Sequence, residues 1–478
     1  MMKSGVAVLG AVLLALVLIA IAALVGFGIP NRAAGMAAKC ICSAAFVAQR
    51  PLPNLFADEV LPASPVLAAI GISVDTANKS VTARFAGLFP RQARLLPDRG
   101  CVLDVALADA PPPAPEPGTP LPAAAPDIAQ PWPLGDTPLS PANWGAGVDA
   151  LALQQLVQNA FIGAGDPQAA NTRGLAIVHS GRLLVLRTAP GFDVSTPQHG
   201  WSMAKTVLGM LTWKLAAETG LDFESPVVDV FAKERAPQWV AAWRTDARRD
   251  IKVSDLLYMR DGLDSTEDYN PWGSVPRMLW GHADAAAFSA SSKAEAAPGQ
   301  RWRYLSQTAN LLAAVDRTRF STDAAYWAYP AKALFTPIGA RSAVMETDTA
   351  GNWVGSSYVW ASVGDWARLG QLMLADGRWG GQQVLPPGWL QFASTRSTPE
   401  GVGRSYGAHT DRIGDPAEGS CRSYGLPPDT VAMMGHWGQM VAMVPSRELV
   451  LVRLGWTFRR GQFDGCAMVA AALKALPG

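Results

Sequence analysis

The sequence has few ionisable residues for its length. Only 17% of its 478 residues are Asp, Glu, Lys or Arg, and the formal net charge at pH 7 is +1. A protein that binds nucleic acid or an acidic surface usually carries a clear excess of positive charge. The composition therefore indicates neither kind of partner.

Residues that bind transition metals are also scarce. The chain has five histidines and five cysteines, and no Cys-x-x-Cys pair or histidine cluster has the spacing of a zinc site. The two closest cysteines, Cys40 and Cys42, have no histidine near them in the sequence. We therefore predict no metal site and no cofactor.

One segment near the N-terminus has no charge at all. It spans residues 5–29, between Lys3 and Arg32. About 20 apolar residues span a bilayer, whereas the apolar core of a signal peptide has about 7–15. We predict a signal-anchor in residues 1–31 that exports the chain and anchors it in the inner membrane, facing the periplasm. Small residues at 20–23 leave a cleaved signal peptide, and a secreted or periplasmic protein, as the alternative.

Export would permit disulfide bonds. Cys101 could pair with Cys42 or with Cys40, and Cys421 could pair with Cys466. One cysteine is then left over. The sequence does not decide between Cys40 and Cys42 as the partner of Cys101.

Three regions follow the apolar segment. Residues 32–110 include an alternating, strand-like stretch at 80–88 and are predicted to form a small N-terminal region. Residues 111–144 are rich in proline, which favours extended backbone and indicates a linker or a strap over the next domain. The remaining region, residues 145–478, is the largest.

Periodic patterns in the largest region predict both helices and strands. A helix is expected at about 148–162, and two apolar runs around a Ser-Gly turn at 175–186 predict a β-hairpin. Two further strands are expected on either side of a turn at Pro445-Ser446-Arg447. The region is thus expected to mix helices with antiparallel strands.

A loop-rich stretch at 264–298 holds carboxylates and aromatic residues, among them Glu267, Asp268, Tyr269 and Trp272. Exposed side chains of these kinds could line a substrate cleft. A loop packed by its own tryptophans explains the composition equally well.

The most informative motif is S-x-x-K, formed by Ser202 and Lys205. A loop rich in Gly and Pro ends at Ser202, where an apolar, helix-forming run begins. Residues three positions apart share one face of a helix, so the amine comes within reach of the hydroxyl. A lysine that accepts the serine proton makes the serine a nucleophile. By itself the motif is weak, and a capping serine with a solvated lysine is the competing interpretation.

Gly200 and Ala204 around Ser202 also resemble the G-x-S-x-G elbow of α/β-hydrolases. That elbow needs a strand that ends directly before the turn. The last strand-like residue here is near Leu186, and glycine and prolines intervene. We therefore disfavour the elbow.

A second motif consists of Tyr304 and Ser306, directly before another apolar, helix-forming run. A tyrosine followed two residues later by a small polar residue can place a phenol and a hydrogen-bonding group in a cleft. The phenol would relay the serine proton and then protonate the leaving group. A half-buried structural tyrosine is the alternative.

A third motif is His436-Trp437-Gly438, followed by Gln439 and a strand-like run. A glycine within the first strand would let a substrate approach the backbone closely. The backbone N–H of Gln439 could then join that of Ser202 in an oxyanion hole.

These three motifs, in this order and spacing, resemble the serine β-lactamase and penicillin-binding-protein superfamily. The chain is most similar to the class C-like branch, which includes family VIII carboxylesterases and 6-aminohexanoate-dimer hydrolase. The resemblance covers about 145–478 and includes residues 364–370 and 384–390. It implies an α/β (α+β) fold in which an antiparallel sheet flanked by helices packs against a helical subdomain, with the site between them. The predicted transmembrane helix and the small leading region precede this fold.

The resemblance also implies a role for each matching residue. Ser202 would be the nucleophile, Lys205 the base, and Tyr304 the proton relay and leaving-group acid. The substrate-binding residues would be Ser306, His436, Trp437 and Gly438. The family uses no classical triad, so His199 need not be catalytic.

Two departures from the family pattern bear on the substrate. His436 stands where β-lactamases and D,D-peptidases usually carry lysine, and histidine is mostly neutral near pH 7. Ser306 replaces the asparagine of β-lactamases. Both changes favour esters or amides over β-lactams and peptides that carry a carboxylate.

We therefore expect a serine hydrolase of the carboxylesterase or oligoamide hydrolase type, with a small-molecule ester or amide as substrate. A β-lactamase or D,D-peptidase is the alternative within the enzyme class. A catalytically idle binding or sensor module of the cell envelope is the alternative outside it. The membrane is expected as a partner through the N-terminal helix, and the sequence indicates no oligomeric state.

Overall fold

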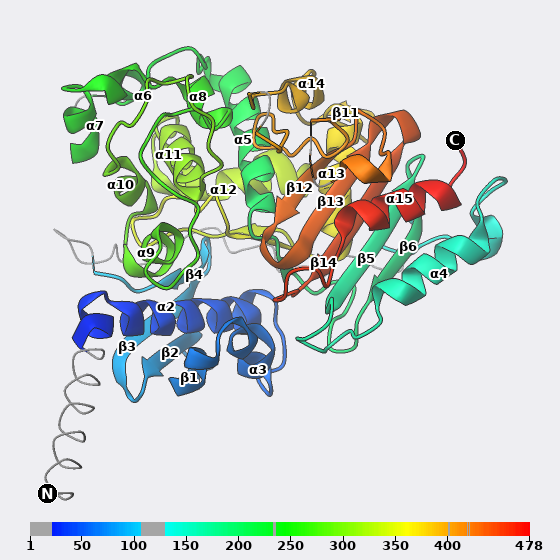
Figure 1. The fold of residues 1–478 in the computed structure, drawn as a ribbon, viewed down its shortest axis with the longest axis horizontal. Coiled ribbons are helices and arrows are strands. Elements are labelled where there is room, and N and C mark those ends of the chain that lie inside the picture. The colour runs from blue at the N-terminus through cyan, green and yellow to red at the C-terminus, as the bar shows by residue number, and fades with distance from the viewer. Residues whose placement is uncertain (1–21, 107–129, 233–235, 400–401, 418, 420) are drawn as a thin grey trace, which may run out of the picture.

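The computed structural model describes most of the chain (Figure 1). The described residues are 22–106, 130–232, 236–399, 402–417, 419 and 421–478. The apolar segment predicted to be a signal-anchor falls mostly on residues 1–21, outside the described residues. In the described ranges, no helix combines the length and the apolar character needed to cross a bilayer.

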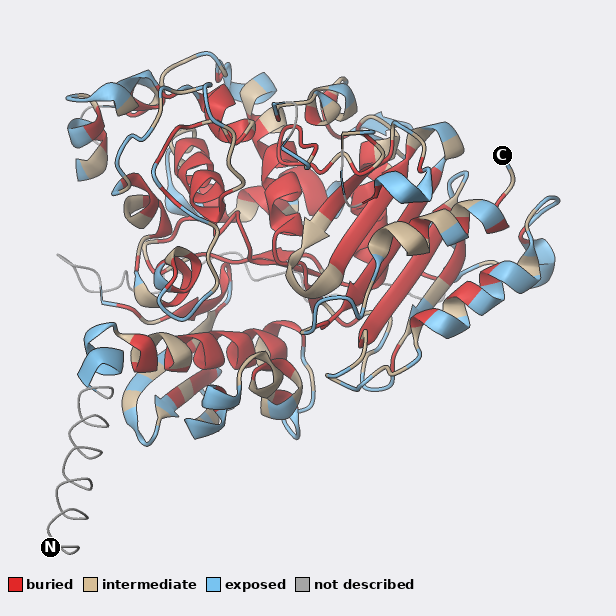
Figure 2. Cartoon of the chain, viewed as in Figure 1, coloured by how far each residue is buried: buried red, intermediate tan, exposed pale blue. Residues whose placement is uncertain are grey.

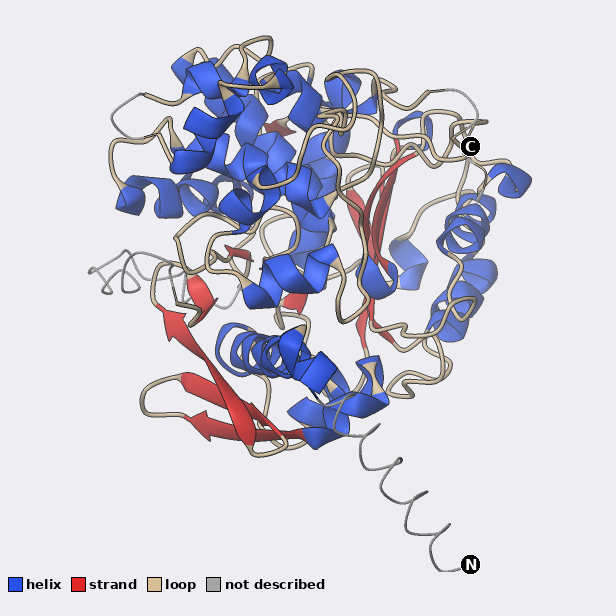
Figure 3. Cartoon of the chain, turned by 60° about the vertical axis from the view of Figure 1, so that its left-hand side comes forward, coloured by secondary structure: helices blue, strands red, loops and turns tan. Residues whose placement is uncertain are grey.

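The first unit is a helix packed on a four-stranded antiparallel sheet of order β1-β2-β3-β4. Helix α2 lies between this sheet and the rest of the molecule (Figures 1 and 3). The elements are α2 (Ile29–Cys42), α3 (Leu55–Glu59), β1 (Ile70–Asp75), β2 (Ser80–Phe85), β3 (Leu88–Leu96) and β4 (Gly100–Leu103). The strand-like stretch at 80–88 is confirmed. The sequence analysis did not predict α2, in which 11 of the 14 residues are buried.

The disulfides resolve the open pairing. Cys42 at the end of α2 is bonded to Cys101 on β4, and Cys421 is bonded to Cys466. Cys40 is the free, buried cysteine. The Cys421–Cys466 prediction is confirmed, and of the two candidates for Cys101 the structure has Cys42.

The centre of the molecule is a five-stranded antiparallel sheet of order β12-β13-β14-β5-β6. Its strands are β5 (Thr172–His179), β6 (Arg182–Thr188), β12 (Val431–Gly435), β13 (Gln439–Val444) and β14 (Leu449–Gly455). Both predicted strand pairs are confirmed, with turns at Ser180-Gly181 and at Pro445–Arg447. β5 pairs with β14, so segments from opposite ends of this region lie side by side.

Helices cover both faces of the central sheet. Ala176 and Val178 face the core formed with α5 and α13, whereas Leu175 and Ile177 face the core formed with α4 and α15. This alternation buries the strands on both sides, as Figure 2 shows. The covering helices are α4 (Ala150–Ala160), α5 (Met203–Thr219), α13 (Val363–Leu374) and α15 (Gly465–Ala475).

A largely helical part lies beside the sheet (Figure 1). Its helices are α6 (Val227–Val230), α7 (Gln238–Trp243), α8 (Val253–Leu257), α9 (Ser274–Gly281), α10 (Ala285–Ala290), α11 (Ser306–Arg317) and α12 (Asp323–Pro330). The remaining strands and α-helix are β7 (Gln198–His199), β8 (Val344–Met345), β9 (Val359–Ala361), β10 (Arg378–Trp379), β11 (Gln382–Gln383) and α14 (Trp389–Ser394). Helices α9 and α10 fall in the stretch 264–298, which the sequence analysis described only as loop-rich. Their short apolar runs are interrupted by glycine and proline, so no long period marks them.

The N-terminal unit shares a hydrophobic core with the larger region. Side chains of α2 and the first sheet pack in one cluster with Trp201, Tyr358 and Trp360. A buried ion pair joins Lys39 of α2 to Glu346, and both side chains are at most 4% exposed. The unit is therefore packed into the body of the protein.

Part of the proline-rich region lies against α13. The guanidinium of Arg368 forms an ion pair with Asp136 and donates hydrogen bonds to the carbonyl groups of Pro133 and Gly135. Trp132 stacks on the same guanidinium at 4.8 Å. Residues 132–136 thus form a strap over this helix.

Candidate functional site

Ser202 lies in a tight turn between strand β7 and helix α5. Trp201 has φ 49°, a left-handed conformation that is costly for a bulky residue. A Cβ atom on Gly200 would lie 2.2 Å from the ring of Trp366, so only glycine fits there. Packing around these two residues therefore holds the serine directly before the first turn of α5.

The structure corrects one step of the sequence analysis. A strand, β7, does end directly before this turn, although the sequence showed none after Leu186. β7 is only two residues long, which is too short for an alternating pattern. The partner of the Ser202 hydroxyl is nonetheless Lys205, so the elbow of α/β-hydrolases remains disfavoured.

Lys205 is the centre of the site. Its side-chain nitrogen lies 3.0 Å from Ser202 Oγ, 3.1 Å from Ser306 Oγ and 3.2 Å from the carbonyl oxygen of Ser356. The residue is 1% exposed, and Ser202 makes no side-chain cap on α5. The interpretation as a capping serine with a solvated lysine is therefore wrong.

Ser306 is held from the other side by Glu267. The Ser306 hydroxyl donates to Glu267 Oε1 at 2.7 Å, and its backbone N–H donates to Oε2 at 2.6 Å. Ser306 is the first residue of α11 and fully buried. A continuous hydrogen-bond chain therefore runs from Ser202 through Lys205 and Ser306 to Glu267.

The ring face of Tyr304 lies against the side chains of Lys205 and Arg404. The ring centroid lies 4.6 Å from the Lys205 nitrogen and 4.1 Å from the guanidinium carbon of Arg404. Arg404 is itself paired with Asp411 at 2.6 Å. The structure thus brings Tyr304 to the predicted site, directly beside the lysine.

A second tyrosine, Tyr269, also reaches the nucleophile. Its phenol lies beside the hydroxyls of Ser202 and Ser306, and its ring stacks on His436 at 4.3 Å with an interplanar angle of 4°. Burial raises the pKa of Tyr269 well above its usual value, and Glu267 adds to the effect, so the phenol keeps its proton. The sequence analysis gave Tyr269 and Glu267 no catalytic role, although it identified their loop as a possible cleft lining.

His436-Trp437-Gly438 forms the turn between β12 and β13. Of the two glycines in this stretch, Gly438 lies in the turn, whereas Gly435 is the last residue of β12, in keeping with the expected glycine in a strand. Trp437 (φ 60°) and Gly438 (φ 83°) are both left-handed, a conformation that belongs to tight turns. His436 packs against Trp201 and Tyr269, so the turn still borders the site.

Burial lowers the pKa of His436 to about 4. Its imidazole is therefore neutral near pH 7, as the sequence analysis expected.

Gln439 is the first residue of β13 and pairs with Gly435 at the end of β12. Its side-chain amide hydrogen-bonds to the backbone of Gly455 on β14. A Cβ on Gly435 would lie 2.2 Å from the carbonyl oxygen of Gly200, so the end of β12 closely approaches the turn before Ser202. The oxyanion-hole role of the backbone N–H groups of Ser202 and Gln439 stays a prediction.

Two further histidines near the site are structural. His199 stacks between Trp201 at 4.2 Å and Trp360 at 4.8 Å, and burial lowers its pKa to about 3. The ring of His409 lies between the carbonyl oxygens of Lys205 and Leu256, and burial lowers its pKa to about 4. Neither contacts the Ser202 hydroxyl through a hydrogen bond that the structure describes.

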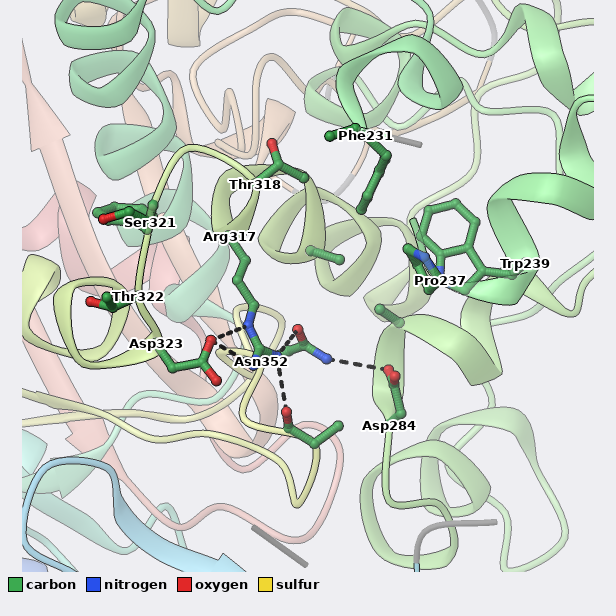
Figure 4. A pocket seen from close by; sticks show the side chains of 15 residues that line it. Phe231, Pro237, Trp239, Asp284, Arg317, Thr318, Ser321, Thr322, Asp323 and Asn352 are labelled. Carbon is green, nitrogen blue, oxygen red and sulfur yellow. Dashed lines mark hydrogen bonds and ion pairs between the residues drawn. The ribbon is translucent and has the colours of Figure 1, made fainter. Parts of the chain in front are cut away.

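A separate hollow of about 360 Å³ lies in the helical part (Figure 4). Its polar side chains bind one another: Arg317 contacts Asp323 and Asn352, and Asn352 donates to Asp284 at 3.3 Å. Ser202 is not part of its lining. Among the described residues, no cluster of three or more His, Cys, Asp or Glu could hold a metal ion.

Comparison with solved structures shows the fold. A protein from Bacillus anthracis described as a 6-aminohexanoate-dimer hydrolase is 19% identical, with a TM-score of 0.53 over 68% of this chain and 83% of its own. EstCE1, a hydrolase with promiscuous acyltransferase activity, is 15% identical, with a TM-score of 0.52 over 69% of this chain and 98% of its own. A family VIII carboxylesterase is 13% identical, with a TM-score of 0.51 over 70% of this chain and 98% of its own.

Comparison of the sequence with protein families identifies the larger region. No curated protein matches the chain. The family model described as Beta-lactamase matches residues 150–465, well over half of the chain. That range contains the central sheet, the helical part and the Ser202 site. The chain therefore belongs to the beta-lactamase family.

Proposed function

We propose that this protein is a serine hydrolase that cleaves an ester or an amide through an acyl-enzyme on Ser202. The observation that carries the proposal is the set of hydrogen bonds around Lys205. A protonated ammonium has three N–H donors and no acceptor, whereas a neutral amine has two N–H donors and one lone pair.

In the reactive state that we propose, Lys205 is the neutral amine. The Ser356 carbonyl can only accept a hydrogen bond, and the Ser306 oxygen accepts because its own proton goes to Glu267. These two acceptors take both N–H groups of a neutral amine. Its lone pair is then left facing Ser202 Oγ at 3.0 Å, which is the geometry of a general base.

The reaction proceeds in two halves. Ser202 Oγ forms a bond to the carbonyl carbon while its proton passes to Lys205, and the negative charge develops on the carbonyl oxygen. The backbone N–H groups of Ser202 and Gln439 stabilise that charge. The bond to the alcohol or amine then breaks as Tyr304 gives its proton to the leaving group and takes up the proton that Lys205 received from Ser202. Water cleaves the acyl-enzyme by the reverse sequence of proton transfers.

The uncharged His436 supports a substrate without a carboxylate. A β-lactam or a D,D-peptide carries an anionic carboxylate, which the lysine cation of the family motif can bind. Burial keeps His436 neutral near pH 7. The fold neighbours named as a family VIII carboxylesterase and a 6-aminohexanoate-dimer hydrolase are compatible with an ester or amide substrate.

We further propose that the protein is exported and anchored in the inner membrane, with the Ser202 site facing the periplasm. Two disulfides support an oxidising compartment. The apolar run at 5–29 supports the anchor.

The test uses the full-length protein in detergent. Hydrolysis of p-nitrophenyl acetate and butyrate is followed for the parent and Ser202→Ala, and a fluorophosphonate adduct is sought by intact mass. The exposed Ser291 gives a matched control, Ser291→Ala. We expect activity and adduct in the parent and the control, and neither in Ser202→Ala.

Two other outcomes decide against the proposal. Hydrolysis of a chromogenic β-lactam far faster than that of the esters would assign the β-lactamase alternative. Equal rates and no adduct in the folded parent and Ser202→Ala would assign the idle envelope module.

A further inference from the structure

We propose that Glu267 is a positioning residue for the reaction: it fixes the direction of the Ser306 proton and thereby aims the lone pair of Lys205 at Ser202. The inference rests on the proposed function. It concerns a residue that lies outside the three sequence motifs and 39 positions before Ser306.

Glu267 holds Ser306 with both carboxylate oxygens. Oε1 accepts the hydroxyl proton at 2.7 Å, and Oε2 accepts the backbone N–H at 2.6 Å. A carboxylate has no proton to donate, so the Ser306 hydroxyl can only be a donor in this pair. Ser306 is fully buried, so water does not compete for its proton.

The direction of the Ser306 hydroxyl proton decides whether Lys205 faces a hydrogen-bond acceptor or a donor. While the proton points to Glu267, the Ser306 oxygen offers lone pairs to the lysine at 3.1 Å and takes one of its N–H groups. If the hydroxyl turned away from Glu267, its proton would point either at the phenol of Tyr269 or at Lys205, where it would compete with Ser202 for the amine lone pair. Glu267 therefore fixes a single direction of donation along the series of hydrogen bonds that runs from Ser202 through Lys205 and Ser306 to Glu267.

A purely structural role is the competing explanation. Glu267 accepts the N–H of the first residue of α11, so it also caps that helix and lies where an anion is favourable. A cap would affect the stability of α11 whether or not Ser306 has a hydroxyl. The two explanations therefore differ in how the effects of Glu267 and Ser306 combine.

Glu267→Gln is the main test, because glutamine keeps the shape but replaces one acceptor oxygen with an NH₂ donor. Its NH₂ group must face one of the two Ser306 donors, and this conflict is relieved when the hydroxyl turns its proton to Tyr269 or Lys205. We expect the second-order rate constant of fluorophosphonate labelling at Ser202, kinact/KI, to fall by about 10–100-fold, the loss that is typical when a group that orients a metal ligand is removed. Tm is measured on the same samples.

A double-mutant cycle separates positioning from capping. Ser306→Ala removes the hydroxyl but keeps the backbone N–H that Glu267 caps. In that background we expect Glu267→Gln to cause no further loss in labelling rate. The inference would be overturned if the losses in labelling rate caused by Glu267→Gln and Ser306→Ala multiply in the double variant. It would also be overturned if Ser306→Ala is labelled at the rate of the parent, and this second outcome can be measured even if Glu267→Gln does not fold.

Asp149→Asn is the matched control, because Asp149 caps α4 through the N–H of Ala152. We expect it to change Tm only. If the parent forms no adduct at Ser202, the proposed function fails. If the parent forms the adduct and a folded Glu267→Gln labels at the same rate, only this inference fails.

Discussion

The buried ion pair between Lys39 and Glu346 makes a strong prediction about stability. Removing one member of a buried pair leaves the other charge without its partner, which costs about 3–5 kcal/mol. Glu346 would keep hydrogen bonds from Ser43 at 2.9 Å, Cys101 at 2.7 Å and Trp360 at 2.9 Å. These three donors reduce the loss, so we expect Lys39→Met to lower the free energy of unfolding by about 3 kcal/mol.

The assay is thermal unfolding of the full-length protein in detergent. A loss of 3 kcal/mol lowers Tm by about 6–12 °C in a domain of 150–250 residues, and we expect the lower end here because the chain is longer. Lys252→Met is the matched control, because Lys252 pairs with Glu224 at 2.9 Å while both side chains are about half or more exposed. Exposed pairs contribute about 0–1 kcal/mol, so its Tm should change by about 2 °C or less.

A charge-neutral second variant tests the reason for the loss. In Lys39→Met/Glu346→Gln no unpaired charge remains, so the Tm should recover part of what Lys39→Met lost. Equal Tm values for Lys39→Met and Lys252→Met would refute the reasoning, because burial would then make no difference. A Tm of Lys39→Met/Glu346→Gln lower than that of Lys39→Met would refute the explanation that an unpaired carboxylate causes the loss of stability.

Three further predictions concern catalysis and pH. Tyr304→Phe should lower kcat/KM for p-nitrophenyl butyrate about 100-fold or more, the usual contribution of a general acid; a change below about 3-fold would remove it from the mechanism. Tyr269→Phe should cost about 10-fold, because it removes the phenol hydroxyl that lies beside Ser202; a larger loss than for Tyr304→Phe would make Tyr269 the proton relay. Burial lowers the pKa of His199 to about 3 and that of His409 to about 4, so only the unfolded chain binds protons at these two rings, and their contribution to stability should fall as pH drops below about 6.5. Buried carboxyls such as Asp261, whose pKa burial raises to about 6, act in the opposite direction, so the two rings are followed directly by NMR; imidazole signals that show protonation at pH 5 in the folded protein would contradict the buried, neutral state of both rings.

The parts of the site that the sequence predicted are those defined by local spacing. Ser202 and Lys205 are one helical turn apart, so their contact follows from the geometry of α5 alone. Tyr304 and Ser306 were placed by their position before an apolar helix, and α11 begins at Ser306. The central sheet was predictable for the same reason, because its strands are long and apolar.

The parts that the sequence did not predict depend on tertiary structure. Glu267 meets Ser306 only because a loop before α9 folds back onto the start of α11. Strand β7 exists through pairing with β9, a segment more than 150 residues later. The turn at Trp437 and Gly438 needs left-handed backbone at a tryptophan, which sequence preferences for turns do not indicate.

The shared core explains why the N-terminal unit bears on the Ser202 site. Trp201 holds a costly backbone conformation directly before Ser202, and such strain persists only where the surroundings determine it. Its indole packs in the same cluster as α2 and stacks on His199 at 4.2 Å. Lys39 of α2 pairs with Glu346 beside β8, which lies in the small sheet with β7. The unit therefore helps to hold the turn that carries the proposed nucleophile, and it is packed into the same body as the Ser202 site rather than being a spacer.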